Sequence, residues 1–425
     1  MVSVLGSFIL PLTKSEFSRA MRLGHGRALM HVREFGLWEV QDEVLHAWVK
    51  NLVFDTQCED SRARWLAEFI DGVPDWLVDP LLDAYAMSVE NRDLFQMAEL
   101  LCVLAKRGCG KARQALYHQF RNTDWGFLGE EELLELDGAQ ALLWMVQKLN
   151  SSENIEAWRL EGLIGSYDFV YGEGEGRKLL SQAPGREAKA FLARISEPRQ
   201  RLIGPRQRLE HLNGVGFIEA AHQKQISVGG VRSWSLRATP EELQAVAAAL
   251  KTTDDPEALQ LFLRCFQSTG LPEYWAGLID FANHQVYEVR WLALWVLGHH
   301  HHPDVRSLAL QRLEENRTGE GEFKLLVRNF EKGDAKRILA ALRRLPSMEE
   351  HDFHWLLGDI LEVAKANPLK ESLALLVYAY EKMPCTNCRQ KAVLEMRRRG
   401  DLPDWIFRES HFDCDFELRE KLAAG

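Results

Sequence analysis

Apolar residues recur through most of the chain at the spacing of amphipathic helices. Within residues 40–54 they lie on one side of a predicted helix, at Val40, Val44, Ala47, Trp48 and Leu52. Further stretches of about three turns each predict helices at 60–70, 76–87, 94–106, 111–120 and 139–149. Short joints containing Gly or Pro separate many of these stretches, which favours antiparallel helical hairpins.

The helical pattern returns in full at residue 238. Thr239, Pro240 and Glu242 have the spacing of an N-cap, a first helical residue and the carboxylate of a capping box. After them the periodicity predicts helices at 241–250, 256–268, 273–282, 286–297, 304–313, 323–330, 334–345, 352–366, 370–382 and 388–398.

The periodicity weakens between these two regions. Residues 198–208 contain two prolines, and residues 214–237 contain four glycines and mixed polar positions. Alternation typical of strands is confined to 1–10 and 213–237. We therefore divide the chain into an N-terminal helical array (1–196), a basic irregular connector (197–237) and a C-terminal array (238–425).

An acid, an apolar residue and an arginine recur at the start of predicted helices. The acid–arginine pairs are Glu288 with Arg290, Asp304 with Arg306, and Glu417 with Arg419. We expect these six residues to form a ladder of charged contacts that fixes each helical hairpin on the next. The arrangement resembles HEAT-repeat (armadillo-like) proteins, most clearly over 239–425 and more loosely over 13–196. This resemblance implies an all-α fold, an α-solenoid of stacked antiparallel helical hairpins.

Composition is that of a globular protein. Of 425 residues, 46% are hydrophobic and 27% are charged, which argues against disorder. No apolar run reaches the roughly 18 residues that a membrane span needs, and residues 1–12 lack the basic start of an export signal. The seven cysteines are odd in number and scattered, so we expect reduced thiols, a cytoplasmic protein of bacterial type and no membrane partner.

Positive charge is concentrated in one segment. The net charge of the chain is −10, yet residues 177–237 hold 12 basic and 4 acidic residues. The candidate partner-binding residues in it are Arg194, Arg199, Arg201, Arg206 and Arg208. Arginine side chains suit phosphate groups, so this segment could bind a nucleic-acid backbone. The alternative is that it neutralises the acidic N-terminal array inside the protein.

Two groups of residues could bind metal. Cys385, Cys388, His411 and Cys414 offer four ligands of the kinds that hold structural zinc, provided that the two segments fold together. Packed reduced thiols, or a redox pair at a helix N-terminus, are the alternatives. The run of four histidines at 299–302 is interpreted as a surface joint that binds transition metals adventitiously.

No established catalytic motif is present. The chain has no G-x-S-x-G, H-E-x-x-H or Walker sequence. The acidic run at 130–132 begins a predicted helix, where we expect it to be solvated and favoured by the helix dipole. The leading hypothesis is a non-catalytic scaffold without a cofactor that binds a protein partner on an extended surface. The alternative is a nucleic-acid-binding protein that uses 177–237.

A narrower alternative comes from one group of HEAT-like proteins, the bacterial alkylpurine DNA glycosylases. These proteins bind DNA with solenoid aromatics, an Asp and an Arg. The present chain resembles them only in residue types, with 13 tryptophans that include Trp125, Trp144, Trp158 and Trp234. No residue aligns with that family's motif, and tryptophans on helical stripes, such as Trp48 and Trp65, are expected in the core.

Overall fold

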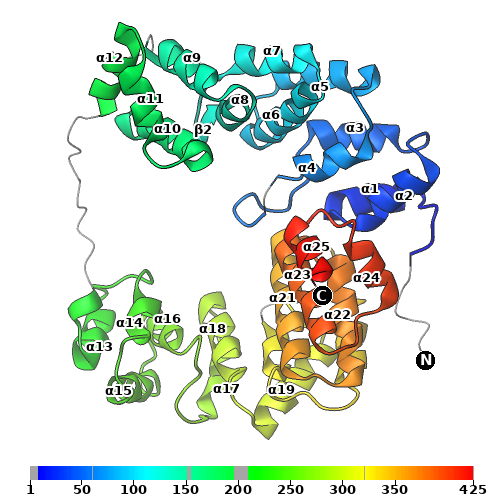
Figure 1. Ribbon diagram of the computed structural model, residues 1–425. Coiled ribbons are helices and arrows are strands. Elements are labelled where there is room, and N and C mark those ends of the chain that lie inside the picture. Colours follow the sequence, from blue (N-terminus) through cyan, green and yellow to red (C-terminus); the bar gives the residue numbers. More distant parts are fainter. Residues whose placement is uncertain (1–7, 60, 151–154, 196–208, 320, 425) are drawn as a thin grey trace. The chain divides into compact units, whose positions relative to one another are not determined.

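A computed structural model describes residues 8–59, 61–150, 155–195, 209–319 and 321–424 (Figure 1). In these residues the chain forms twenty-five α-helices, four short 3-10 helices and one two-stranded hairpin. The predicted all-α fold class is therefore confirmed. A search of the same residues for a helix long and apolar enough to cross a membrane found none.

The chain divides into two compact units. The first unit combines Ser7–Leu202 with Phe407–Gly425, and the second unit spans Ile203–Ile406. The predicted C-terminal array includes residues 407–425, whereas the structure groups them with the first unit. The boundary near residue 202 lies inside the predicted connector.

The first unit is a series of helices with one small hairpin between α7 and α8. Its elements are α1 (Lys14–Leu23), α2 (Gly26–Phe35), α3 (Gln41–Val49), α4 (Ala63–Leu66), η1 (Ala67–Phe69), α5 (Asp75–Met87), α6 (Asn91–Lys106), α7 (Gly110–Gln119), β1 (Arg121–Thr123), β2 (Gly126–Leu128), α8 (Glu130–Asp137), α9 (Ala139–Asn150), α10 (Ala157–Tyr171), α11 (Glu175–Gln182), α12 (Arg186–Ile195) and α25 (Phe416–Ala423). Most helices pack on elements close to them in the chain, such as α6 on α7 and α10 on α11. One hydrophobic cluster runs from Leu12 to Ile195.

The C-terminal segment packs on the first helices of the same unit. Phe412 and Phe416 contact the hydrophobic cluster, and the indole Nε1 of Trp65 donates to the carbonyl oxygen of Phe412 at 2.9 Å. The close approach depends on Gly26, because a Cβ there would lie 2.1 Å from the carbonyl oxygen of Glu409. No sequence motif predicts this contact, which joins residues more than 340 positions apart.

The second unit is also helical, and its elements pack mainly on near neighbours in the chain. Its elements are η2 (Leu209–His211), α13 (Gly214–His222), α14 (Val231–Ser235), α15 (Pro240–Leu250), α16 (Pro256–Cys265), α17 (Gly277–Phe281), α18 (Tyr287–Leu297), α19 (Pro303–Glu314), η3 (Glu322–Leu326), α20 (Asp334–Leu342), α21 (Glu350–Ala366), η4 (Lys370–Ser372), α22 (Leu373–Lys382) and α23 (Thr386–Arg398). The helix α24 (Asp404–Ser410) runs across the boundary between the units. The predicted capping box is present, with Thr239 and Glu242 bonded to each other's backbone at the start of α15.

Residues 209–237 contain η2, α13 and α14, joined by turns, where the sequence predicts an irregular connector. The side chain of Asn213 caps α13 by accepting from the N–H of Gly216, and the rings of Phe217 and Trp234 stack with centroids 4.1 Å apart. Glu242 of α15 accepts a hydrogen bond from the N–H of Gly214 at 3.0 Å. This packing makes α13 and α14 part of the second unit. The strand-like alternation of 213–237 is therefore not a strand in the described residues.

Candidate metal centre and partner surface

One histidine and two cysteines come together in the second unit. His354 lies in α21, Cys385 is the N-cap of α23, and Cys388 is the third residue of α23. The Nε2 atom of His354 is 3.3 Å from the Sγ atom of Cys388, and the three potential ligand atoms all lie within 4.8 Å of one another. In the described residues no other group of His, Cys, Asp or Glu has this geometry.

Local structure explains why the two cysteines meet. The C-x-x-C spacing places its residues at the N-cap and in the first turn of α23, so both thiols lie at the same end of the helix. The packing of α21 on α22 and α23 brings His354 to that end. Cys385 is buried, while His354 and Cys388 are half-buried. The hydrogen bond with Cys388 and the burial of Cys385 raise the pKa of the Cys385 thiol.

The predicted zinc ligands are only partly brought together. Cys385 and Cys388 are neighbours, but His411 and Cys414 belong to the first unit and are absent from the described ligand cluster. His411 bonds the carbonyl oxygen of Phe407 through Nδ1, at 2.8 Å. Cys414 donates its backbone N–H to the carbonyl oxygen of Gly24, at 3.1 Å. His354 is not among the predicted ligands, because only the packing of α21 on α23 makes it a neighbour of the C-x-x-C pair.

The run of four histidines joins neighbouring loops of the second unit. The ring of His299 bonds the carbonyl oxygen of Gln267 at 3.0 Å, and that of His301 bonds the carbonyl oxygen of Arg328 at 2.8 Å. The ring of His302 is the N-cap of α19 and accepts from the N–H of Asp304. These contacts give three of the four rings a structural role.

Of the predicted ladder residues, Arg306 bonds an acid from another helix. Its guanidinium donates to both carboxylate oxygens of Asp334 at the start of α20, at 2.6 and 3.2 Å, and also pairs with Glu331 at 3.0 Å. Asp334 is fully buried. Asp304 instead accepts from the hydroxyl of Tyr274 at 2.9 Å. The acid and the arginine of this motif therefore bond different partners.

The other two motifs use their arginines in different ways. Arg290 donates to the carbonyl oxygens of His284 and Gln285, in the joint before its own helix. Arg419 pairs with Glu68 at 2.7 Å in the first unit, and Glu417 pairs with Lys421 on the same helix. Glu288 is exposed. One sequence motif thus supports three kinds of contact.

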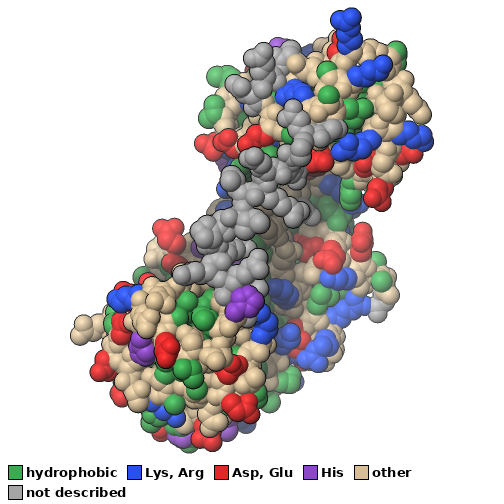
Figure 2. All heavy atoms as spheres, turned by 90° about the vertical axis from the view of Figure 1, so that its left-hand side faces the viewer, with side chains coloured by type: hydrophobic (Ala, Val, Ile, Leu, Met, Phe, Trp, Pro, Cys, Tyr) green, Lys and Arg blue, Asp and Glu red, His purple; other side chains and the backbone are tan. Residues whose placement is uncertain are grey.

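The basic candidate residues lie largely outside the described part of the chain. Arg199, Arg201, Arg206 and Arg208 are among these undescribed residues. Arg194 lies in the last turn of α12 and donates to the carbonyl oxygens of Leu149 and Ile155 at 3.2 and 3.3 Å. Figure 2 shows basic and acidic side chains interspersed over the described residues on the face that it presents.

The acidic run at the start of α8 is partly buried, which corrects the expectation that it is solvated. Glu132 is buried and Glu130 is half-buried, while Glu131 is exposed. Burial raises the pKa of Glu132 to about 8 and that of Glu130 to about 7. A helix dipole favours acidic residues at this position. Packing nevertheless shields the carboxyls of Glu130 and Glu132 from full contact with water.

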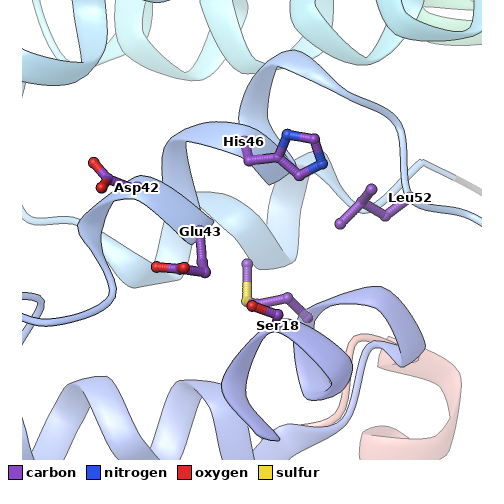
Figure 3. Close-up of a pocket in the computed structure, with 6 residues that line it drawn as sticks. Ser18, Asp42, Glu43, His46 and Leu52 are labelled. Carbon is purple, nitrogen blue, oxygen red and sulfur yellow. The ribbon is translucent and has the colours of Figure 1, made fainter. Parts of the chain in front are cut away.

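A small pocket of about 190 Å³ lies between α1 and α3 of the first unit. Its lining residues are Ser18, Met21, Asp42, Glu43, His46 and Leu52. Figure 3 shows the carboxylates of Asp42 and Glu43 directed away from the imidazole of His46. Glu43 pairs with Lys14 at 3.1 Å. The polar side chains do not converge, so the pocket offers no catalytic arrangement.

One face of α10 exposes two large aromatic residues with two glycines between them. Trp158 is 53% exposed and Phe169 is 93% exposed. They are eleven residues apart, which is three turns of helix, so both point from the same side. Gly162 and Gly165 lie between them on that side, and a Cβ at either glycine would meet no atom of the described residues within 4 Å. The opposite face of α10 is buried.

The hairpin is bonded to the N-terminal end of α10, next to Trp158. Arg159 of α10 donates to Asn122 at 2.7 Å and to the carbonyl oxygens of Thr123 and Asp124, so α10 and the hairpin are held together. Trp125 in the hairpin turn is 56% exposed and stacks on Phe95 of α6. We call the set Trp125, Trp158, Gly162, Gly165 and Phe169 the α10 surface; Figure 1 shows α10 beside β2.

Comparison of the chain with protein-family models, with curated proteins and with solved structures found no match. The HEAT-like relationship therefore stays a prediction that rests on the sequence motif.

Proposed function

We propose that this protein is a non-catalytic, HEAT-like scaffold that binds a helix of a protein partner on the α10 surface. The observation that supports the proposal most directly is the exposed face of α10, with its aromatic residues at each end and its glycines between them. The helical-repeat pattern adds support, because stacked repeats commonly present extended binding surfaces.

The two glycines of this face indicate what kind of partner it could bind. A glycine inside a helix destabilises it by roughly 0.5–1 kcal/mol relative to alanine. Gly162 and Gly165 are exposed, and a Cβ added at either position would meet no atom of the described residues within 4 Å, so packing within the described part of the chain does not explain them. A partner helix that approached the backbone of α10 closely at these two positions would explain why they carry no side chain.

The aromatic residues suit the same kind of partner. Tryptophan is enriched among the residues that dominate binding energy at protein interfaces, and such residues lie in preorganised surroundings. Trp125 is supported by Phe95, and the indole of Trp158 donates to the carboxylate of Glu156. The exposed rings are thus held in place before binding, which lowers the entropy lost on association.

A binding assay with matched variants tests the proposal. The full-length protein is used to capture partners from a native lysate, and the identified partner is then titrated in purified form. We expect Gly165→Gln to abolish binding, because its side chain occupies the space of the partner backbone. The control Trp38→Ala removes an aromatic residue that is 89% exposed but lies outside the α10 surface, and should leave binding intact.

The glycine variant separates binding from folding. Gly165→Gln replaces a helix-interior glycine by a better helix former, so the variant should be at least as stable as the wild type. Equal affinity of Gly165→Gln and the wild type for every captured partner would overturn the proposal.

A further inference from the structure

We propose that His354, Cys385 and Cys388 bind one Zn²⁺ ion, with the fourth coordination position open. One imidazole nitrogen and two thiolate sulfurs are ligands that zinc prefers, and the three atoms already lie within 4.8 Å of one another. This site lies in the second unit and is independent of the proposed partner surface in the first.

The spacing of the ligand atoms is close to what tetrahedral zinc requires. Zinc bonds of about 2.3 Å to sulfur and about 2.0 Å to nitrogen imply a sulfur–nitrogen separation of about 3.5 Å in a tetrahedron. The observed distance from His354 Nε2 to Cys388 Sγ is 3.3 Å. Small side-chain rotations would therefore form the site, and the backbones of α21 and α23 would keep their positions.

The protein supplies three ligands, and the fourth comes from outside the cluster. No fourth His, Cys, Asp or Glu of the described residues has a ligand atom within the same radius. The partial exposure of His354 and Cys388 leaves one side of the cluster open to solvent. Water would complete the coordination, as in other zinc sites with three protein ligands.

Binding involves proton release and no oxidation or reduction. Each of the two thiols loses its proton and becomes a thiolate bonded to zinc, while neutral His354 binds through a nitrogen lone pair. One Zn²⁺ therefore displaces two protons, and the ion together with two thiolates and one neutral imidazole carries no net charge. The ion would link α21 to the start of α23 and so stabilise the second unit.

Cobalt(II) is the probe that reports on the ligands directly. The full-length protein is reduced, stripped of metal with a chelator and titrated with Co²⁺, and then Zn²⁺ is added. We expect one Co²⁺ per chain, with thiolate-to-cobalt charge-transfer absorption and intense d–d bands of tetrahedral geometry. Zn²⁺ should remove this spectrum, and calorimetry in buffers of different ionisation enthalpy should count two protons released.

Variants assign the signal to the cluster. Cys388→Ser and His354→Gln should each weaken Co²⁺ binding by roughly 100-fold or more, since even outer-shell partners contribute 10–100-fold. Cys58→Ser changes an exposed thiol of the first unit, and His301→Asn changes the histidine run. Both controls should bind Co²⁺ as the wild type does.

Several outcomes would overturn the proposal. One is the absence of charge-transfer absorption in the reduced wild type. Another is an unchanged Co²⁺ affinity in His354→Gln. Because His354 is half-buried, this variant should fold, and it therefore provides the test if Cys388→Ser does not fold. A third is a Cys385–Cys388 disulfide that persists when reductant and Zn²⁺ are both present, which would identify the pair as a redox couple.

Discussion

Arg27 bonds Glu409, a residue 382 positions later in the chain. The backbone N–H of Arg27 donates to Glu409 Oε1 at 3.1 Å, and its guanidinium donates to both carboxylate oxygens, with Nη2 2.7 Å from Oε2. Glu409 is fully buried and Arg27 nearly so. The pair holds the C-terminal segment against α2. Residues from the two ends of the first unit's sequence are therefore bonded to each other.

We expect Arg27→Ala to destabilise the first unit by about 3–5 kcal/mol, because the change removes the guanidinium that is bonded to the buried carboxylate of Glu409. The free energy of unfolding, measured with urea, provides the test. Lys111→Ala is the matched control, since Lys111 and Asp79 form an exposed pair whose loss should change the free energy of unfolding much less. Equal effects of the two substitutions would contradict the structural role of the buried pair.

Arg306 and Arg290 occupy the same place in the sequence motif but should differ in their contributions to stability. Arg306→Ala leaves the buried carboxylate of Asp334 with weaker compensation, and we expect a loss of about 3 kcal/mol. Arg290 donates to backbone carbonyls in a joint, and Arg290→Ala should cost about 1 kcal/mol. Thermal unfolding of both variants compares them. If Arg290→Ala caused the larger loss of stability, the arginines of the ladder would act through the acid of their own motif and not through an acid of another helix.

Glu132 should make the first unit less stable as the pH rises. Burial raises the pKa of this carboxyl from its ordinary 4.5 to about 8. Below pH 4.5 the group is protonated in both states. Between pH 4.5 and 8 the unfolded chain releases the proton while the folded chain keeps it, so the folded state loses stability as the pH rises. Glu130, whose pKa is also raised, acts in the same direction.

Glu132→Gln tests this explanation, because glutamine stays neutral at every pH. The variant should be more stable than the wild type at pH 8, and the difference should shrink towards pH 5. Urea midpoints at the two pH values measure the change. Glu131→Gln changes an exposed position of the same helix turn and keeps Glu132, so this control should lose stability with rising pH as the wild type does. A wild type that gains stability from pH 5 to 8 relative to Glu132→Gln would refute the burial effect.

Helical periodicity and caps were sufficient to predict much of the secondary structure. The predicted helix at 139–149 corresponds to α9 (Ala139–Asn150), and the Thr239 capping box begins α15. The short strands at 121–123 and 126–128 were missed, since three residues are too few to show alternation. The helix α13 was missed because its two glycines were interpreted as breakers, although Asn213 caps it and Phe217 anchors it.

The candidate sites were harder to predict, because they depend on contacts between distant segments. The C-x-x-C spacing indicated Cys385 and Cys388, yet the third member of the cluster, His354, comes from another helix. Nothing in the local sequence marks Glu132 as buried, since an acid suits the start of any helix. The α10 surface was also missed, because exposed glycines in a helix look like loop residues until their surroundings are known.

Gly162 and Gly165 lie in open surroundings, whereas Gly26 of the same unit is closely packed. Gly162→Ala and Gly165→Ala should each stabilise the first unit by about 0.5–1 kcal/mol, because the added Cβ meets open space and alanine favours the helix. Gly26→Ala should destabilise the same unit, because its Cβ would lie 2.1 Å from the backbone oxygen of Glu409. Urea unfolding of the three single variants measures both effects. If Gly162→Ala and Gly165→Ala also destabilise the protein, then the α10 face is packed against something in this chain, and it is not free to receive a partner helix.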